Sequence, residues 1–337
     1  MGDMMLWFTV AVAAVILFAW LSPIPAVFTI RLAFSKGNAV PPEDYAELAS
    51  CVNAFKDLRY PSKYRDNFAD IYLPKTQNGK IPVVLWIHGG AFVGGSKKDV
   101  AIYATALAVE GVAVVCMNYR RAPEAKYPVP VRQTAEAYRW LNEIAEEYDF
   151  DMDRFLLAGD SAGAHIAAQF AAIQSNVDYA HALDFEQIVP LPTLRAVLLF
   201  CGPFDVAKIG GFKHAVFGFF MRRVAWAYTG ARDWTDPRLS QLTIADYITK
   251  DFPATFITDG NYLSFEEHGR ALAEALAAKG VVVESHFIPR EETKAAHEYQ
   301  FVMNKEVGQE AFQHVVRFLE THTKLSCEGE HAYGGDI

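Results

Sequence analysis

Apolar and polar positions fall into blocks along most of this chain. Continuous apolar runs of about four to eight residues indicate buried strands, and apolar residues three and four positions apart indicate helices. Strands are predicted at 67–73, 81–87, 112–117, 155–158, 194–201, 254–258 and 281–288, and helices at 103–110, 131–148, 162–173, 265–278 and 307–321. Apolar strands that alternate with helices predict an α/β fold, in which helices cover both faces of a mostly parallel sheet. The loose alternation at 67–73 predicts an edge strand.

Three segments fall outside this alternation. Residues 35–63 form a polar segment before the first predicted strand. Residues 203–251 form a long aromatic-rich insertion between two core strands, and we expect it to be a helical cap, because such insertions in compact domains are usually functional. The polar, Gly-rich residues 325–337 are expected to be a disordered tail. The main domain is therefore predicted to span 36–324.

The N-terminal segment is apolar throughout, with no periodic alternation of apolar and polar residues. Residues 4–30 contain no charged side chain, and Met4–Leu21 would extend about 27 Å as a helix, close to the thickness of a bilayer core. No positive side chain precedes this run and prolines follow it, which is unlike a cleaved signal peptide. We therefore expect residues 1–35 to be a single-pass transmembrane anchor. Arg31 and Lys36 follow the apolar run and favour a cytoplasmic domain. The alternative is an apolar helix packed on the domain.

Composition limits the possible functions. Hydrophobic residues make up 52% of the 337 and charged residues 21%, which predicts a folded chain with a sizeable core. The formal net charge of −9 argues against a nucleic-acid partner, because an acidic surface repels phosphates. The four cysteines lack the paired spacing of zinc sites. Cys116 and Cys201 fall in predicted strands, where a thiol is a small apolar side chain.

A serine lies at the junction between a predicted strand and a predicted helix. The sequence Gly159-Asp-Ser161-Ala-Gly163 follows the apolar strand 155–158 and begins the helix 162–173. A nucleophile held on such a sharp turn needs small neighbours, because the backbone passes close to itself. The pattern therefore predicts Ser161 as a nucleophile.

A glycine-containing loop follows the predicted strand 81–87. It reads His88-Gly-Gly-Ala-Phe92. Acyl transfer places negative charge on a carbonyl oxygen, and backbone N–H groups directed at that oxygen stabilise it. We expect the donors to be Gly89, Gly90 and Ala162, the last being the residue after the nucleophile.

A third segment completes a family resemblance. Asn118-Tyr-Arg-Arg-Ala-Pro-Glu124, with Tyr127-Pro128, lies between the two motifs above. In this order the three pieces resemble the hormone-sensitive-lipase branch of the α/β-hydrolases, over about residues 65–322. The resemblance implies an α/β-hydrolase fold and ester hydrolysis through an acyl-enzyme, without a metal or cofactor. The third glycine of the family's triplet is Ala91 here, at a position that tends to support the loop rather than donate.

The serine needs a general base and an acid to orient it. The resemblance places the base between the last strand and the final helix, where His297 lies. Related enzymes carry the acid just after the strand at 254–258, as Asp followed by Pro-Leu. This chain lacks that pattern, and Asp259 is the nearest carboxylate. Glu266, in the first turn of the next helix, and Asp205, after the preceding strand, are the alternatives.

Together these features predict a serine carboxylesterase or lipase-like hydrolase for small to medium carboxylic esters. A deacetylase of sugars or other small molecules would use the same residues. A third alternative is an inactive ligand-binding homologue such as the plant gibberellin receptor, which resembles this family but has lost its base histidine. The expected partners are a small ester and, through the N-terminal helix, a membrane. The oligomeric state is left open.

Overall fold

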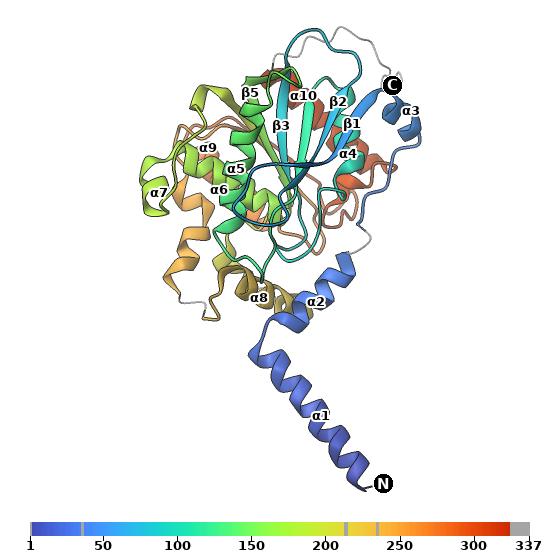
Figure 1. Cartoon of the computed structure of the whole chain (residues 1–337), viewed down its shortest axis with the longest axis vertical. Helices are drawn as coiled ribbons and strands as arrows, with labels where there is room; N and C mark the ends of the chain where they lie inside the picture. Colours follow the sequence, from blue (N-terminus) through green and yellow to red (C-terminus); the bar gives the residue numbers. More distant parts are fainter. Residues whose placement is uncertain (1, 35–36, 212–214, 234–235, 324–337) are drawn as a thin grey trace.

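The computed structural model describes residues 2–34, 37–211, 215–233 and 236–323, and its main domain is built on an eight-stranded sheet (Figure 1). The strands are β1 (Val52–Arg59), β2 (Phe68–Pro74), β3 (Ile81–Ile87), β4 (Ala113–Met117), β5 (Phe150–Asp160), β6 (Leu194–Phe200), β7 (Ala254–Asp259) and β8 (Val283–Phe287). Their order across the sheet is β1-β2-β4-β3-β5-β6-β7-β8. The pairs β1–β2 and β2–β4 are antiparallel, and the remaining pairs are parallel. The predicted α/β fold with a mostly parallel sheet is confirmed.

Burial on both faces of the sheet explains the continuous apolar strands. All seven residues of β3 are buried. Successive side chains of a strand point to opposite faces, so Val83 and Leu85 join the core on one face, whereas Val84 and Trp86 join the core on the other.

Helices cover both of these faces. The helices of the domain outside the insertion are α3 (Tyr45–Ser50), α4 (Ala101–Val109), α5 (Val129–Glu143), α6 (Ala162–Ser175), α7 (Val177–Ala182), α9 (Glu266–Ala278) and α10 (Glu306–Thr323). Apolar side chains of α5, α6 and α9 join the core that contains Val83, and those of α4 and α10 join the core that contains Val84. These are the layers expected for an α/β domain.

The antiparallel end of the sheet differs from the sequence prediction. The polar segment 35–63 contains α3 and β1, and β1 is the edge strand. Only Val52 of β1 is fully buried, so no period marks this strand in the sequence. The segment 67–73, expected at an edge, corresponds to β2, which lies between β1 and β4 and is almost entirely buried. Its loose alternation reflects burial on both faces.

The insertion at 203–251 begins at the carboxyl end of β6 and forms a cap with a small core of its own. It contains helix α8 (Ala215–Thr229) and the 3₁₀ turns Val206–Gly211, Pro237–Leu242 and Ile244–Tyr247. Its apolar core includes Val206 and Leu242, and Phe265 from the loop before α9 packs into it. The cap therefore contacts the loop that follows β7.

Two N-terminal helices occupy different environments. Helix α1 (Gly2–Leu21) projects away from the domain, whereas α2 (Ile24–Ala33) lies against it beside α8 (Figure 1). Among the described residues, α1 is the helix long and apolar enough to cross a membrane, and a signal sequence would meet the same criterion. The expected tail, 325–337, lies outside the described residues.

Candidate active site

Ser161 lies on the strained turn between β5 and α6. Its φ of 51° and ψ of −118° are unusual for a residue with a side chain. A Cβ at Gly159 would lie 2.4 Å from the carbonyl group of Gly163, and a Cβ at Gly163 would lie 1.9 Å from the carbonyl oxygen of Ile87. Both positions therefore require glycine, and the same close packing holds the serine in its strained conformation.

His297 meets this serine from the loop between β8 and α10. Its Nε2 atom lies 2.9 Å from Oγ of Ser161. Burial lowers the pKa of His297 to about 4, so the imidazole is neutral near pH 7 and can accept the serine proton. The ring of Phe265 packs edge-on against the imidazole, with 5.5 Å between centroids.

Asp259 connects to the base through another residue. Nδ1 of His297 lies 2.7 Å from Oγ of Ser264, and the Ser264 hydroxyl donates to Oδ1 of Asp259. Asp259 ends β7 and is almost completely buried, and burial raises its pKa to about 7. The arrangement is a chain of four side chains: Ser161, His297, Ser264 and Asp259. The sequence analysis did not identify Ser264. The one indication that the acid is linked differently here was the absence of the Asp-Pro-Leu pattern from this loop.

The two alternative acids are engaged elsewhere. Glu266 forms ion pairs with Arg270 at 2.8 Å and with Arg290 at 3.5 Å. Asp205 pairs with Lys208 at 2.9 Å and accepts a hydrogen bond from a threonine hydroxyl of the cap. Of the three candidate acids, Asp259 is the one that is joined to His297 by hydrogen bonds, through Ser264.

The loop at 88–95 changes the expected set of oxyanion donors. The N–H of Gly89 donates to Oδ2 of Asp160 at 2.7 Å, so this amide is already used inside the protein and the expectation for Gly89 does not fit. Within the described part of the chain, the amides of Gly90, Ala91 and Ala162 have no hydrogen-bond partner. A Cβ at Gly90, whose φ is +105°, would lie 2.4 Å from the carbonyl group of Gly94, so the loop can close this tightly only with glycine there.

A buried pair of carboxyl groups supports this loop. Asp160 accepts hydrogen bonds from Nε1 of Trp86, at 2.7 Å, and from Gly89, and it shares a hydrogen bond with Glu298. Burial raises the pKa of Asp160 to about 6 and raises the pKa of Glu298 well above its usual range. A hydrogen bond between two carboxyl groups requires a proton, so the pair holds one. It joins the nucleophile turn, the glycine loop and the base loop.

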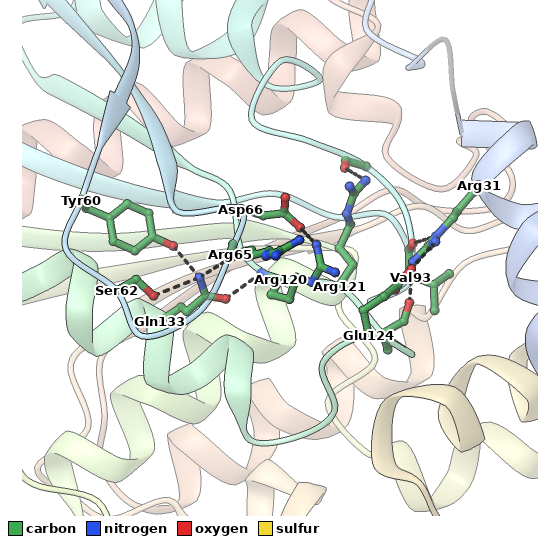
Figure 2. Close-up of polar contacts among 12 residues, drawn as sticks. Arg31, Tyr60, Ser62, Arg65, Asp66, Val93, Arg120, Arg121, Glu124 and Gln133 are labelled. Atoms are coloured by element: carbon green, nitrogen blue, oxygen red, sulfur yellow. Dashed lines mark hydrogen bonds and ion pairs between the residues drawn. The ribbon is translucent and has the colours of Figure 1, made fainter.

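The third motif of the sequence holds the same loop from its other side. Figure 2 shows Arg121, whose guanidinium donates to the carbonyl of Gly95 at 2.9 Å, and Glu124, which pairs with Arg31 of α2. Arg120 forms an ion pair with Asp66 at 2.9 Å. No role for these charges was predicted. Arg121 contacts the loop directly, Glu124 binds Arg31 of α2, and Arg120 contacts the segment between β1 and β2.

A cavity of about 910 Å³ lies between the cap and α9. Ser264 and Phe265 line it, and both also contact His297. Its other walls include Phe204, Phe217, Thr243, Leu263, His268 and Leu272. Charged side chains, among them Asp205, Lys208 and Arg290, also line it. The cavity is therefore of mixed polar and apolar character, and it lies beside the base, where a small molecule could bind.

Two groups of side chains within the described residues could hold a metal ion by proximity alone. Their candidate ligand atoms lie within 4.8 Å of one another in each group. One group is Cys201, Asp259 and His297, where the last two are already joined through Ser264. The other is His286, Glu310 and His314, between β8 and α10.

Comparisons with known proteins identify a family for this chain. The model of the BD-FAE family matches residues 69–264. Carboxylesterase NlhH of Mycobacterium tuberculosis is 32% identical over 218 residues, which cover 64% of this chain and 66% of that protein. Esterase LipI of the same organism is 30% identical over 232 residues, covering 64% and 67% of the two chains. The match thus spans about two thirds of either relative.

A solved structure extends the similarity beyond these segments. Esterase B of Lactobacillus rhamnosis superimposes with a TM-score of 0.73, covering 93% of this chain and 97% of that one. The two sequences are 22% identical, so this likeness concerns the fold.

Proposed function

The chain belongs to the BD-FAE family, and we propose that it is a serine carboxylesterase that hydrolyses small to medium carboxylic esters. The observation that carries the proposal is the 2.9 Å contact between Oγ of Ser161 and Nε2 of His297 at a strained strand-to-helix turn. The relatives named carboxylesterase and esterase support the same reaction class.

The reaction proceeds through an acyl-enzyme. His297 accepts the proton of Ser161 at Nε2, and Oγ attacks the ester carbonyl carbon. The amides of Gly90, Ala91 and Ala162 stabilise the oxyanion, each contributing up to about 3 kcal/mol. When the tetrahedral intermediate collapses, the alcohol leaves with the proton from His297. Water, deprotonated by His297, then attacks the acyl group, and the carboxylic acid leaves as Ser161 regains its proton.

Ser264 transmits the effect of the acid. While Nε2 accepts a proton, Nδ1–H of His297 donates to Oγ of Ser264, whose own hydroxyl donates to Asp259. These two hydrogen bonds fix the tautomer that leaves Nε2 free to act as base. The anionic Asp259 then stabilises the imidazolium through one intervening hydroxyl.

The two alternative functions are separable. An inactive ligand-binding homologue would not need the paired Ser161 and His297, whose contact favours an enzyme. A deacetylase is a special case of the proposed reaction, in which the acyl group is acetyl. The length of acyl chain that the cavity accepts distinguishes it from a broader esterase.

We also propose that α1 is a single transmembrane span with the domain on the cytoplasmic side. Met4–Leu21 has the length and composition of a span, and Arg31 and Lys36 follow it on the domain side. Protease protection in sealed vesicles tests this orientation: the domain should be digested from the cytoplasmic side only.

A series of p-nitrophenyl esters from acetyl to palmitoyl tests the activity. The wild-type chain should hydrolyse the short and medium members, and a fluorophosphonate should label Ser161. Ser161→Ala should lower turnover by several orders of magnitude while the thermal unfolding midpoint stays close to that of the wild type. Turnover retained in this variant, at equal purity, contradicts the proposal.

A further inference from the structure

Helix α2 is apolar on two opposite faces. Ala26, Val27 and Ile30 are buried against the domain. Ile24 and Phe28, one turn apart on the other face, are 51% and 69% exposed. A surface helix of a water-soluble domain places polar residues on its outer face, so this second apolar face needs another partner.

Arg31 fixes the direction in which that outer face points. Its Nε donates to the carbonyl of Val93 at 2.7 Å, and its two terminal nitrogens bind the carboxylate of Glu124 in a bidentate pair (Figure 2). The hydrogen bonds from Arg31 lower the pKa of Glu124 to about 2. Val93 belongs to the glycine loop of the active site, so α2 cannot turn without disturbing that loop.

Helix α8 extends the apolar surface. It lies beside α2 at the end of the domain from which α1 projects (Figure 1). Val216 and Phe219, one turn apart on α8, are 61% and 40% exposed. We call Ile24, Phe28, Val216 and Phe219 together the outer patch.

The surroundings of the outer patch are typical of a membrane interface. Arg232 lies 4.5 Å from the ring of Trp20, at the end of α1, and Arg223 lies 4.9 Å from the ring of Phe219. Trp side chains concentrate at the headgroup level, and Arg extends its charge toward phosphate groups. Only Ser22 and Pro23 separate α1 from α2, which is a reach of about 7 Å. The outer patch must therefore lie close to the surface of any bilayer that α1 enters.

We propose that the outer patch lies in the headgroup region of this bilayer and that the enzyme takes its substrate from the membrane. The substrate class is then an amphiphilic ester dissolved in the bilayer. Helix α8 connects the two regions, because Phe217 lines the cavity beside His297 while its neighbours Val216 and Phe219 are exposed. This inference rests on the proposed esterase activity and on the proposed span.

The location of the outer patch can be measured on the full chain in vesicles of phosphatidylcholine and phosphatidylglycerol. Phe28→Cys and Phe219→Cys, each on a Cys51→Ser, Cys327→Ser background, carry an environment-sensitive fluorophore. The matched control is Val282→Cys, at a residue that is 61% exposed just before β8, the strand at one edge of the sheet. Both patch labels should shift to shorter wavelength and be quenched by a nitroxide lipid, and the control label should do neither.

Flotation separates failure of the span from failure of the inference. If the labelled chain does not float with the vesicles, the proposed span is wrong, and the inference fails with it. If the chain floats but the patch labels behave like the label at residue 282, the span stands and the outer patch does not contact the membrane.

Activity tests the substrate class. Phe28→Glu with Phe219→Glu should leave hydrolysis of soluble p-nitrophenyl acetate unchanged and lower hydrolysis of an ester embedded in the same vesicles at least several-fold. Val282→Glu should change neither rate. Equal rates on the embedded ester for the wild type and the double variant overturn the proposed delivery from the membrane. If the wild type hydrolyses neither ester, the proposed esterase function fails instead.

Discussion

Replacing Ser264 by alanine removes the hydroxyl that links His297 to Asp259. The change takes away two hydrogen bonds, one from Nδ1 of the base and one to the carboxylate. A hydrogen bond to a charged group contributes about 1.5–3 kcal/mol, and 1.36 kcal/mol corresponds to about tenfold in rate. Ser264→Ala should therefore lower kcat by roughly 10- to 160-fold. KM should change little, because the interaction strengthens when His297 becomes charged in the transition state.

The assay is steady-state hydrolysis of p-nitrophenyl butyrate by Ser264→Ala, Asp259→Asn and the double variant. If Ser264 acts through Asp259, the two changes are not additive, and Ser264→Ala should cost much less in the Asp259→Asn background than in the wild type. Ser50→Ala, which removes an exposed hydroxyl on α3, is the matched control and should behave as the wild type. Near-normal kcat in Ser264→Ala, or full additivity with Asp259→Asn, would refute the linkage.

Three further predictions follow from the site and its supports. Because burial raises the pKa of Asp259 to about 7, its carboxylate becomes protonated and loses its charge as the pH falls below neutral. The value of kcat/KM should fall over the same pH range. In Asp259→Asn this decrease on the acidic side of the pH profile should be absent. Gly163→Ala should destabilise the fold by about 1–3 kcal/mol or more and abolish activity, because the new Cβ would lie 1.9 Å from a backbone carbonyl oxygen; thermal unfolding and ester hydrolysis measure both effects. Deleting residues 1–21 should preserve activity on soluble esters. Deleting residues 1–35 also removes α2 with its contacts to the glycine loop, and this should lower both activity and solubility. Equal activity of the two deletion variants would contradict this prediction.

Sequence alone predicted those parts of the molecule whose physical requirements are local. The strand β3 is buried on both faces, and that environment admits only the apolar run seen in the sequence. The turn at Ser161 needs glycine on both sides, because any larger residue meets backbone atoms. A single sequence carries both requirements, so the core of the sheet and the turn at Ser161 could be predicted.

Features that depend on contacts across the chain could not be predicted in this way. Strand β1 is mostly exposed, so its pairing with β2 leaves no period in the sequence. Ser264 resembles any serine in a polar loop until the fold brings it between His297 and Asp259. Gly89 has the residue type of an oxyanion donor, but its N–H group donates a hydrogen bond to Asp160, 71 positions later in the sequence.

The single proton shared by Asp160 and Glu298 sets an upper pH limit on the integrity of the site. In the unfolded chain both carboxyl groups would ionise at low pH, whereas burial in the folded protein keeps the pKa of Glu298 well above its usual value. The folded state therefore binds more protons than the unfolded state over that interval, and its free energy of unfolding must decline as the pH rises. Once the shared proton leaves, two like charges repel each other next to Gly89 and His297, which weakens the contacts that hold the three loops together. Alkaline inactivation of this protein would then be a loss of architecture, with the serine and histidine themselves still in their reactive protonation states.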